Sequence, residues 1–225
     1  PHLFSSAASD VYKRQVLAMA TTPGFNNNHF GSTRPEFHRI RSITDQFEPG
    51  STFKVVSTVS ALYDGLISLN DEFNCENGSF EYHTKKVTDH ESYSMLTASQ
   101  ILHHSSNIGI IKIMDQVGQK KLFSMSRDFG FGSKTGINLN GEVSGKLNHY
   151  NDWSAVSLGM IAMGHEVGVT AIQLASAYCA LANGGYLLKP RIVKQIMDES
   201  ENIIFSEEPV VLRKIADDST IESVK

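Results

Sequence analysis

Two capping-box sequences are the features that most constrain how this 225-residue chain folds. The segments 97–100 and 170–173 each read Thr-x-x-Gln, the spacing with which many helices begin. The second helix is predicted to end at Asn183-Gly184-Gly185, because glycine readily adopts the left-handed conformation that stops a helix. No apolar run approaches the length of a membrane span. The sequence therefore predicts short, separately bounded elements.

Strand-like segments accompany these helices. Residues 16–20 predict a strand, and residues 191–197 and 202–205 predict a hairpin around the turn 198–201. The apolar positions between Phe53 and Leu62 predict a further helix, which Ser51 opens and which runs to Gly65. Helices combined with antiparallel strands favour an α+β fold.

Both ends of the chain differ from this pattern. Residues 1–15 have no apolar period and no helix cap, and they lack the apolar centre of a signal peptide. We therefore expect a non-native or disordered tail over 1–15 and a folded domain over 16–225. Residues 217–225 predict the beginning of a helix with no element after it, so we expect the chain to stop within its domain.

Composition excludes several classes of function. The formal net charge of −4 gives no basic surface of the kind that binds nucleic acid. Two cysteines are too few for a disulfide scaffold or a cysteine-based zinc module, and they leave the cellular compartment undecided. The nine histidines lack zinc-protease spacing, and no phosphate-binding Gly-rich loop or Gly-x-Ser-x-Gly elbow occurs. We expect neither a metal nor a cofactor.

The strongest chemical signal is the segment Glu48-Pro49-Gly50-Ser51-Thr52-Phe53-Lys54. Proline and glycine force a tight turn, so Ser51 is predicted at the first helical turn, where free N–H groups favour negative charge. Lys54 follows one turn later on the same face, which predicts its amine within reach of the Ser51 hydroxyl. A neutral lysine can deprotonate a serine if its pKa of about 10.4 falls by about 3.

A Ser-x-x-Lys pair is a short motif and arises by chance in a chain of this composition. The whole seven-residue segment is more specific, because it resembles the active-site serine segment of class B penicillin-binding proteins. That resemblance implies that Ser51 is the acylated nucleophile and Lys54 its base. The non-catalytic alternative is a helix-capping serine beside a solvated lysine.

The same family uses a second motif, Ser-x-Asn, which this sequence contains at residues 68–70, 105–107 and 200–202. Only Ser105-Ser106-Asn107, after the helix capped by Thr97, has surroundings similar to the family segment. The resemblance implies that Ser105 relays a proton between lysine and leaving group. It also implies that Asn107 hydrogen-bonds the substrate amide and the lysine. The alternative is an ordinary helix end closed by serine and asparagine.

The third family motif is Lys-Thr-Gly on a strand, and Lys134-Thr135-Gly136 matches its letters. We reject this match, because the tripeptide lies in the glycine-rich segment 130–137, which has no alternating pattern. The segment resembles instead the family loop FGFG-x-x-TG between the second and third motifs. We expect the true third motif to lie beyond residue 225.

The resemblance covers residues 16–225. It implies the serine β-lactamase/transpeptidase-like fold, an antiparallel sheet with helices on both faces, with the sheet incomplete in this fragment. It also implies a peptidoglycan D,D-transpeptidase of the division or elongation type, which forms an acyl-serine intermediate with D-Ala-D-Ala stem peptides and binds β-lactams. The further matches are Cys75-Glu76-Asn77-Gly78, Asp89-His90, Gly141-Glu142, Val169-Thr170 and Gln173-Leu174.

By the same resemblance, the longer protein is expected at the outer face of the bacterial cytoplasmic membrane, anchored by one span that this sequence lacks. A glycosyltransferase and division or elongation proteins are the implied partners, and nucleic acid is not. The isolated chain is expected to be an impaired enzyme. Two alternatives stay open: a β-lactam sensor or hydrolase of the same fold, and a non-catalytic cell-division scaffold.

Overall fold

Both capping boxes begin helices in the computed structural model, which describes residues 4–225. The Thr97 hydroxyl accepts the Gln100 N–H at 3.2 Å, and the Gln100 side chain accepts the Thr97 N–H at 2.9 Å. In the second box the Thr170 hydroxyl accepts the Gln173 N–H at 3.3 Å, and the Gln173 side chain accepts the Thr170 N–H at 2.9 Å. The helix after Thr170 ends before Gly184 and Gly185, both with positive φ, so this predicted stop is confirmed.

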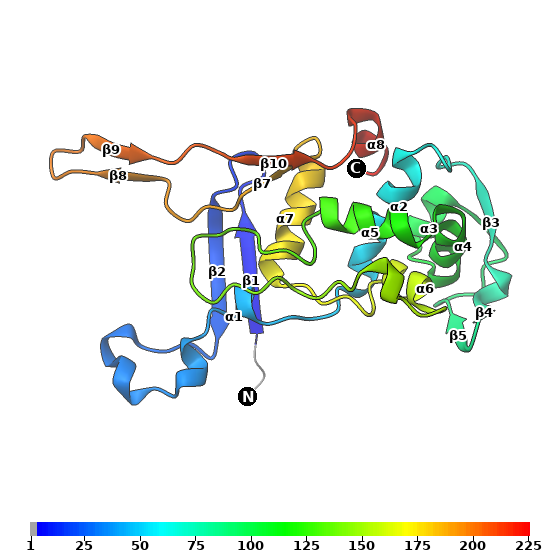
Figure 1. The fold of residues 1–225 in the computed structure, drawn as a ribbon, viewed down its shortest axis with the longest axis horizontal. Helices are drawn as coiled ribbons and strands as arrows, with labels where there is room; N and C mark the ends of the chain where they lie inside the picture. Colours follow the sequence, from blue (N-terminus) through cyan, green and yellow to red (C-terminus); the bar gives the residue numbers. More distant parts are fainter. Residues whose placement is uncertain (1–3) are drawn as a thin grey trace.

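Helices and antiparallel strands make up the molecule, which confirms the α+β class (Figure 1). The helices are α1 Arg41–Thr44, α2 Lys54–Tyr63, α3 Ala98–His103, α4 Asn107–Val117, α5 Gln119–Asp128, α6 Ser157–Ala162, α7 Ala171–Ala182 and α8 Asp218–Ser223. The strands are β1 Phe4–Ser9, β2 Val16–Thr22, β3 Glu72–Asn74, β4 Ser79–Tyr82, β5 Lys85–Thr88, β6 Met95–Thr97, β7 Tyr186–Leu188, β8 Gln195–Met197, β9 Ile203–Ser206 and β10 Val211–Lys214. Within residues 4–225 they form antiparallel pairs: β1–β2, β3–β6, β4–β5, β7–β10 and β8–β9.

The core lies where α2, α4, α5 and α6 meet. Their apolar faces bury residues such as Val56, Val59, Ile111 and Leu122, each at most 1% exposed. Figure 1 shows α7 between this helical part and the β1–β2 pair, and α7 packs directly against β1. Helix α2, which follows the Ser51 segment, is thus surrounded by packed helices and gives that segment a rigid support.

Residues 4–15, expected to be a non-native or disordered tail, contain an ordered strand in the structure. The backbone of Phe4–Ser9 pairs with β2, from Phe4 opposite Thr22 to Ser9 opposite Val16, with a shift of register between Ala8 and Ser9. Arg14 is fully buried and donates a hydrogen bond to the Ser176 hydroxyl. The physical reason is that a hairpin satisfies the backbone groups of both segments, which needs no apolar period. Residues 1–3 lie outside the described residues, and a non-native origin of the segment stays a prediction.

The hairpin predicted around residues 198–201 is confirmed, with a shorter first strand than expected. Strand β8 begins only at Gln195, because Arg191 forms a parallel bridge with Gln15 instead. The hairpin extends away from the helices at one end of the molecule (Figure 1). None of the helices described between residues 4 and 225 combines the length and apolar character that a membrane span requires.

Candidate active site

The predicted nucleophile Ser51 lies in a tight turn. Gly50 has φ of +56°, a left-handed conformation that suits glycine, and residues Gly50–Phe53 form one 3-10 turn. The α-helix itself starts at Lys54, later than the sequence predicted, and the Lys54 N–H donates to the Ser51 carbonyl. The Ser51 side chain is exposed, and among residues 4–225 its hydroxyl makes no hydrogen bond. Phe53 is fully buried and anchors the turn on the core.

Lys54 is almost entirely buried, with 1% of its surface exposed. Its ammonium donates to the Ser105 hydroxyl at 3.0 Å, to the Asn107 Oδ1 at 2.7 Å, and to the Ser105 carbonyl. Burial lowers the pKa of this amine from 10.5 to about 8, while the Asp89 carboxylate acts in the opposite direction. A lysine with this pKa is neutral in a much larger fraction near physiological pH than an ordinary lysine, which is the direction that a base requires.

Residues 105–107 form the corner between α3 and α4. Ser105 has φ of +56°, so the chain turns sharply there, and Ser106 caps α4 by accepting the Gly109 N–H at 2.8 Å. The sequence predicted this triplet only as the end of the helix capped by Thr97; it is also the start of α4. The Asn107 amide donates to the Thr88 carbonyl at 2.9 Å, which orients its oxygen toward Lys54.

Asp89 is a site residue that the sequence analysis listed only as a family-like match and gave no role. One of its carboxylate oxygens accepts the N–H groups of Asn107 at 2.5 Å and Ile108 at 3.1 Å. The other accepts the Ser106 hydroxyl at 2.6 Å. Asp89 therefore fixes the first turn of α4, where a negative charge is favourable. Its spacing from residue 107 gives no local signal, because the contact depends on the tertiary fold.

The structure thus brings together three of the four predicted residues: Lys54, Ser105 and Asn107. Ser51 lies one turn before Lys54 on the same segment, but its hydroxyl is not hydrogen-bonded to the Lys54 amine. The amine is shared among oxygens of the 105–107 corner instead. The arrangement offers an exposed hydroxyl, a buried amine of lowered pKa, and a second hydroxyl in contact with that amine.

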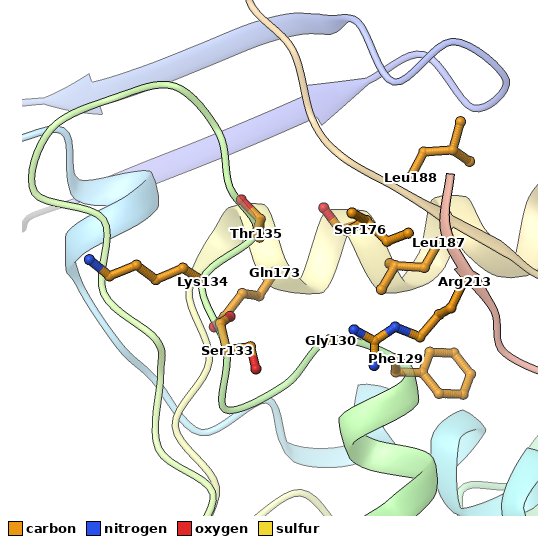
Figure 2. Close-up of a pocket in the computed structure, with 11 residues that line it drawn as sticks. Phe129, Gly130, Ser133, Lys134, Thr135, Gln173, Ser176, Leu187, Leu188 and Arg213 are labelled. Carbon is orange, nitrogen blue, oxygen red and sulfur yellow. The ribbon is translucent and has the colours of Figure 1, made fainter. Parts of the chain in front are cut away.

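Lys134-Thr135-Gly136 lies in a loop, as predicted. The buried Glu142 carboxylate accepts the N–H and hydroxyl of Thr135, each at 2.6 Å, which closes the loop on itself. This loop lines the pocket of Figure 2 together with Gln173, Ser176 and Arg213. The Lys134 amine points away from that pocket in Figure 2. None of the four predicted site residues lines it.

A family model described as penicillin binding protein transpeptidase domain matches residues 6–225. The chain belongs to the penicillin-binding protein transpeptidase family. This membership confirms the resemblance that the EPGSTFK and Ser-x-Asn segments indicated. Over residues 4–225, no cluster of three or more histidine, cysteine, aspartate or glutamate side chains could hold a metal ion.

Similar proteins include peptidoglycan D,D-transpeptidases. This chain is 32% identical over 215 residues to the probable peptidoglycan D,D-transpeptidase PbpC of Pseudomonas aeruginosa, covering 95% of this chain and 38% of the relative. It is 34% identical over 181 residues to the peptidoglycan D,D-transpeptidase FtsI of Escherichia coli K12, covering 80% of this chain and 30% of the relative. Its fold matches that of apo penicillin binding protein 3 from Mycobacterium tuberculosis with a TM-score of 0.87 at 26% identity. The match covers 99% of this chain and 50% of that structure's chain. The chain spans less than two fifths of the length of these curated relatives.

Proposed function

We propose that this chain carries the acyl-serine chemistry of a peptidoglycan D,D-transpeptidase, with Ser51 as nucleophile and Lys54 as base. Ser105 relays a proton and Asn107 binds the substrate amide and the lysine. The observation that supports this best is the buried Lys54 amine, hydrogen-bonded to Ser105 and Asn107 one helical turn after Ser51. A pKa of about 8 leaves about one Lys54 in ten neutral at pH 7, far more than for an ordinary lysine.

In the proposed reaction, the Ser51 oxygen attacks the carbonyl carbon of the penultimate D-Ala of a stem peptide, and its proton passes to the Lys54 amine. The carbon–nitrogen bond to the terminal D-Ala breaks, and the departing amine receives that proton through the Ser105 hydroxyl. An amine of a neighbouring stem peptide then attacks the acyl carbon, and the bond from that carbon to the Ser51 oxygen breaks. The proton that the attacking amine loses returns to the Ser51 oxygen through the Lys54 amine, which restores the hydroxyl. The Ser51 N–H is one oxyanion donor, a contribution of typically about 2.7–4 kcal/mol.

A β-lactam would acylate Ser51 by the same attack, with opening of its ring in place of loss of D-Ala. We place the chemistry outside the cytoplasm, where stem peptides are cross-linked, in a longer protein anchored to the membrane. Glycosyltransferase and division or elongation proteins are the proposed partners. The relatives' names state peptidoglycan transpeptidation alone; the anchor, the compartment and the partners are proposed from the family resemblance.

The test is covalent labelling of the 225-residue chain with a fluorescent penicillin, followed by mass spectrometry of the labelled peptide. We expect a slow adduct on Ser51 that is lost in Ser51→Ala. Ser57→Ala is a matched control, because Ser57 lies on α2, buried and bonded to the Ala162 carbonyl at 3.0 Å. That variant should keep the adduct.

The fate of the adduct separates the alternative functions. An adduct that persists supports a transpeptidase or a sensor, whereas rapid release of the opened antibiotic indicates a hydrolase. If saturating penicillin left Ser51 unmodified in the folded chain, the enzyme proposal would be contradicted and a non-catalytic scaffold favoured.

A further inference from the structure

The turn that carries Ser51 is attached backbone to backbone to a segment far away in the sequence, residues 164–169. The Gly50 N–H donates to the Gly164 carbonyl at 3.1 Å, and Phe47 and Val169 exchange two hydrogen bonds at 3.0 and 2.9 Å. The approach is so close that a Cβ on Gly164 would lie 2.1 Å from the Gly50 carbonyl oxygen. The position of Ser51 therefore depends on how residues 47–50 fit against residues 164–169.

Glu48 joins these two segments through its side chain. One carboxylate oxygen lies 2.9 Å from the Nδ1 of His165, and the other accepts the Glu166 N–H at 2.9 Å. These contacts hold the pKa of Glu48 below its ordinary value, so the carboxylate stays ionised at neutral pH. Glu166 has φ of +58°, a conformation that aims its N–H at Glu48 against its own backbone preference.

We propose that Glu48 is a positioning residue for acylation: by bridging His165 and the Glu166 N–H it fixes the turn that presents Ser51 to the Lys54 amine. This inference rests on the function proposed above. Since the Ser51 hydroxyl has no hydrogen bond of its own among the described residues, its place is set by its backbone. The Lys54 amine, by contrast, is fixed by residues 105–107. A misplacement of about 1 Å between reacting groups costs up to about 100-fold in rate.

The pair contributes little to folding stability, which makes the proposal testable. The Glu48 and His165 side chains are 55% and 46% exposed, and ion pairs at such sites stabilise by about 0–1 kcal/mol. If Glu48 only contributed this surface ion pair, its substitution would therefore change little in either the folding stability or the acylation rate. A positioning role changes the rate of bond formation while the melting temperature stays nearly constant.

The experiment compares Glu48→Ala and Glu48→Gln with the unsubstituted chain in labelling by fluorescent penicillin over a range of concentrations. This separates the dissociation constant of the first complex from the rate constant of acylation. For Glu48→Ala we expect an acylation rate constant about 10-fold lower, with an unchanged dissociation constant and a nearly unchanged melting temperature. Glu48→Gln should recover most of the rate, because its amide oxygen can still accept the Glu166 N–H.

The matched control is Asp64→Ala, which removes an exposed ion pair with Lys121 (2.6 Å) just after the far end of α2. It should leave both constants unchanged. Equal acylation by Glu48→Ala and the unsubstituted chain would overturn the inference. So would a rate loss matched by Glu48→Gln, or by a large fall in melting temperature.

Amide hydrogen exchange provides a readout that does not need acylation. In Glu48→Ala the Gly50 amide should exchange faster, because its bond to Gly164 opens more often. Unchanged exchange at Gly50 would overturn the inference even where labelling succeeds. Absence of labelling in the unsubstituted chain, with faster exchange in the variant, would instead overturn the proposed function and leave the bridging by Glu48 supported.

Discussion

At the scale of single residues, the proposed chemistry depends on the protonation state of Lys54. Its pKa is lowered by burial to about 8, so the neutral amine becomes the main form only above that pH. We predict that the acylation rate rises about tenfold per pH unit below pH 8 and levels off above it. Penicillin labelling from pH 6 to pH 9 measures this profile. Lys54→Arg should abolish labelling, because a guanidinium stays protonated over that range; a flat profile would contradict Lys54 as the base.

The same burial links Lys54 to stability. Because its pKa in the folded chain lies below the 10.5 of an exposed lysine, the unfolded chain binds more protons between these values. This contribution to the free energy of unfolding therefore increases as the pH rises from about 8 toward 10.5. In Lys54→Met the rise in the free energy of unfolding that Lys54 contributes over this pH range should vanish. Denaturant titrations of both chains at pH 7.5 and pH 10 measure it. An identical pH dependence in both chains would contradict the lowered pKa.

At the scale of elements, the start of α4 affects both the stability of the fold and the pKa of Lys54. Asp89 caps this helix and at the same time acts to raise the pKa of Lys54. We predict that Asp89→Ala destabilises the chain by about 0.5–2 kcal/mol, the usual range for loss of a helix cap, and that Asp89→Asn costs less, because its amide oxygen can still accept the Asn107 and Ile108 N–H groups. Asp89→Asn should also move the midpoint of the labelling profile below pH 8, since the nearby negative charge is gone. Asp71→Asn, at an exposed carboxylate bonded to Ser68, is the control that should leave the midpoint in place. A midpoint unchanged in Asp89→Asn would show that Asp89 does not act on the base.

At the scale of the whole molecule, the first strand tests whether residues 1–15 belong to the fold. Strand β1 pairs with β2 and packs against α7, and Arg14 is buried against Ser176. Deleting residues 1–15 should therefore expose one edge of β2 and lower the melting temperature by several degrees, at about 2–4 °C per kcal/mol for a chain of this size. Calorimetry of the two chains measures it. An unchanged melting temperature would instead support the expectation of a foreign tail.

The sequence by itself determined the local features: both capping boxes, the stop at Gly184, the 198–201 hairpin turn, and the family through EPGSTFK. These depend on residues a few positions apart, whose hydrogen bonds and φ preferences are fixed by their own side chains. Only the tertiary structure decided the order of residues 4–15 and the contacts of Asp89 and Glu48. Each of those contacts joins segments far apart in the chain. The partners of a strand edge or a carboxylate depend on which donors the packed fold places beside it, and local sequence does not determine that.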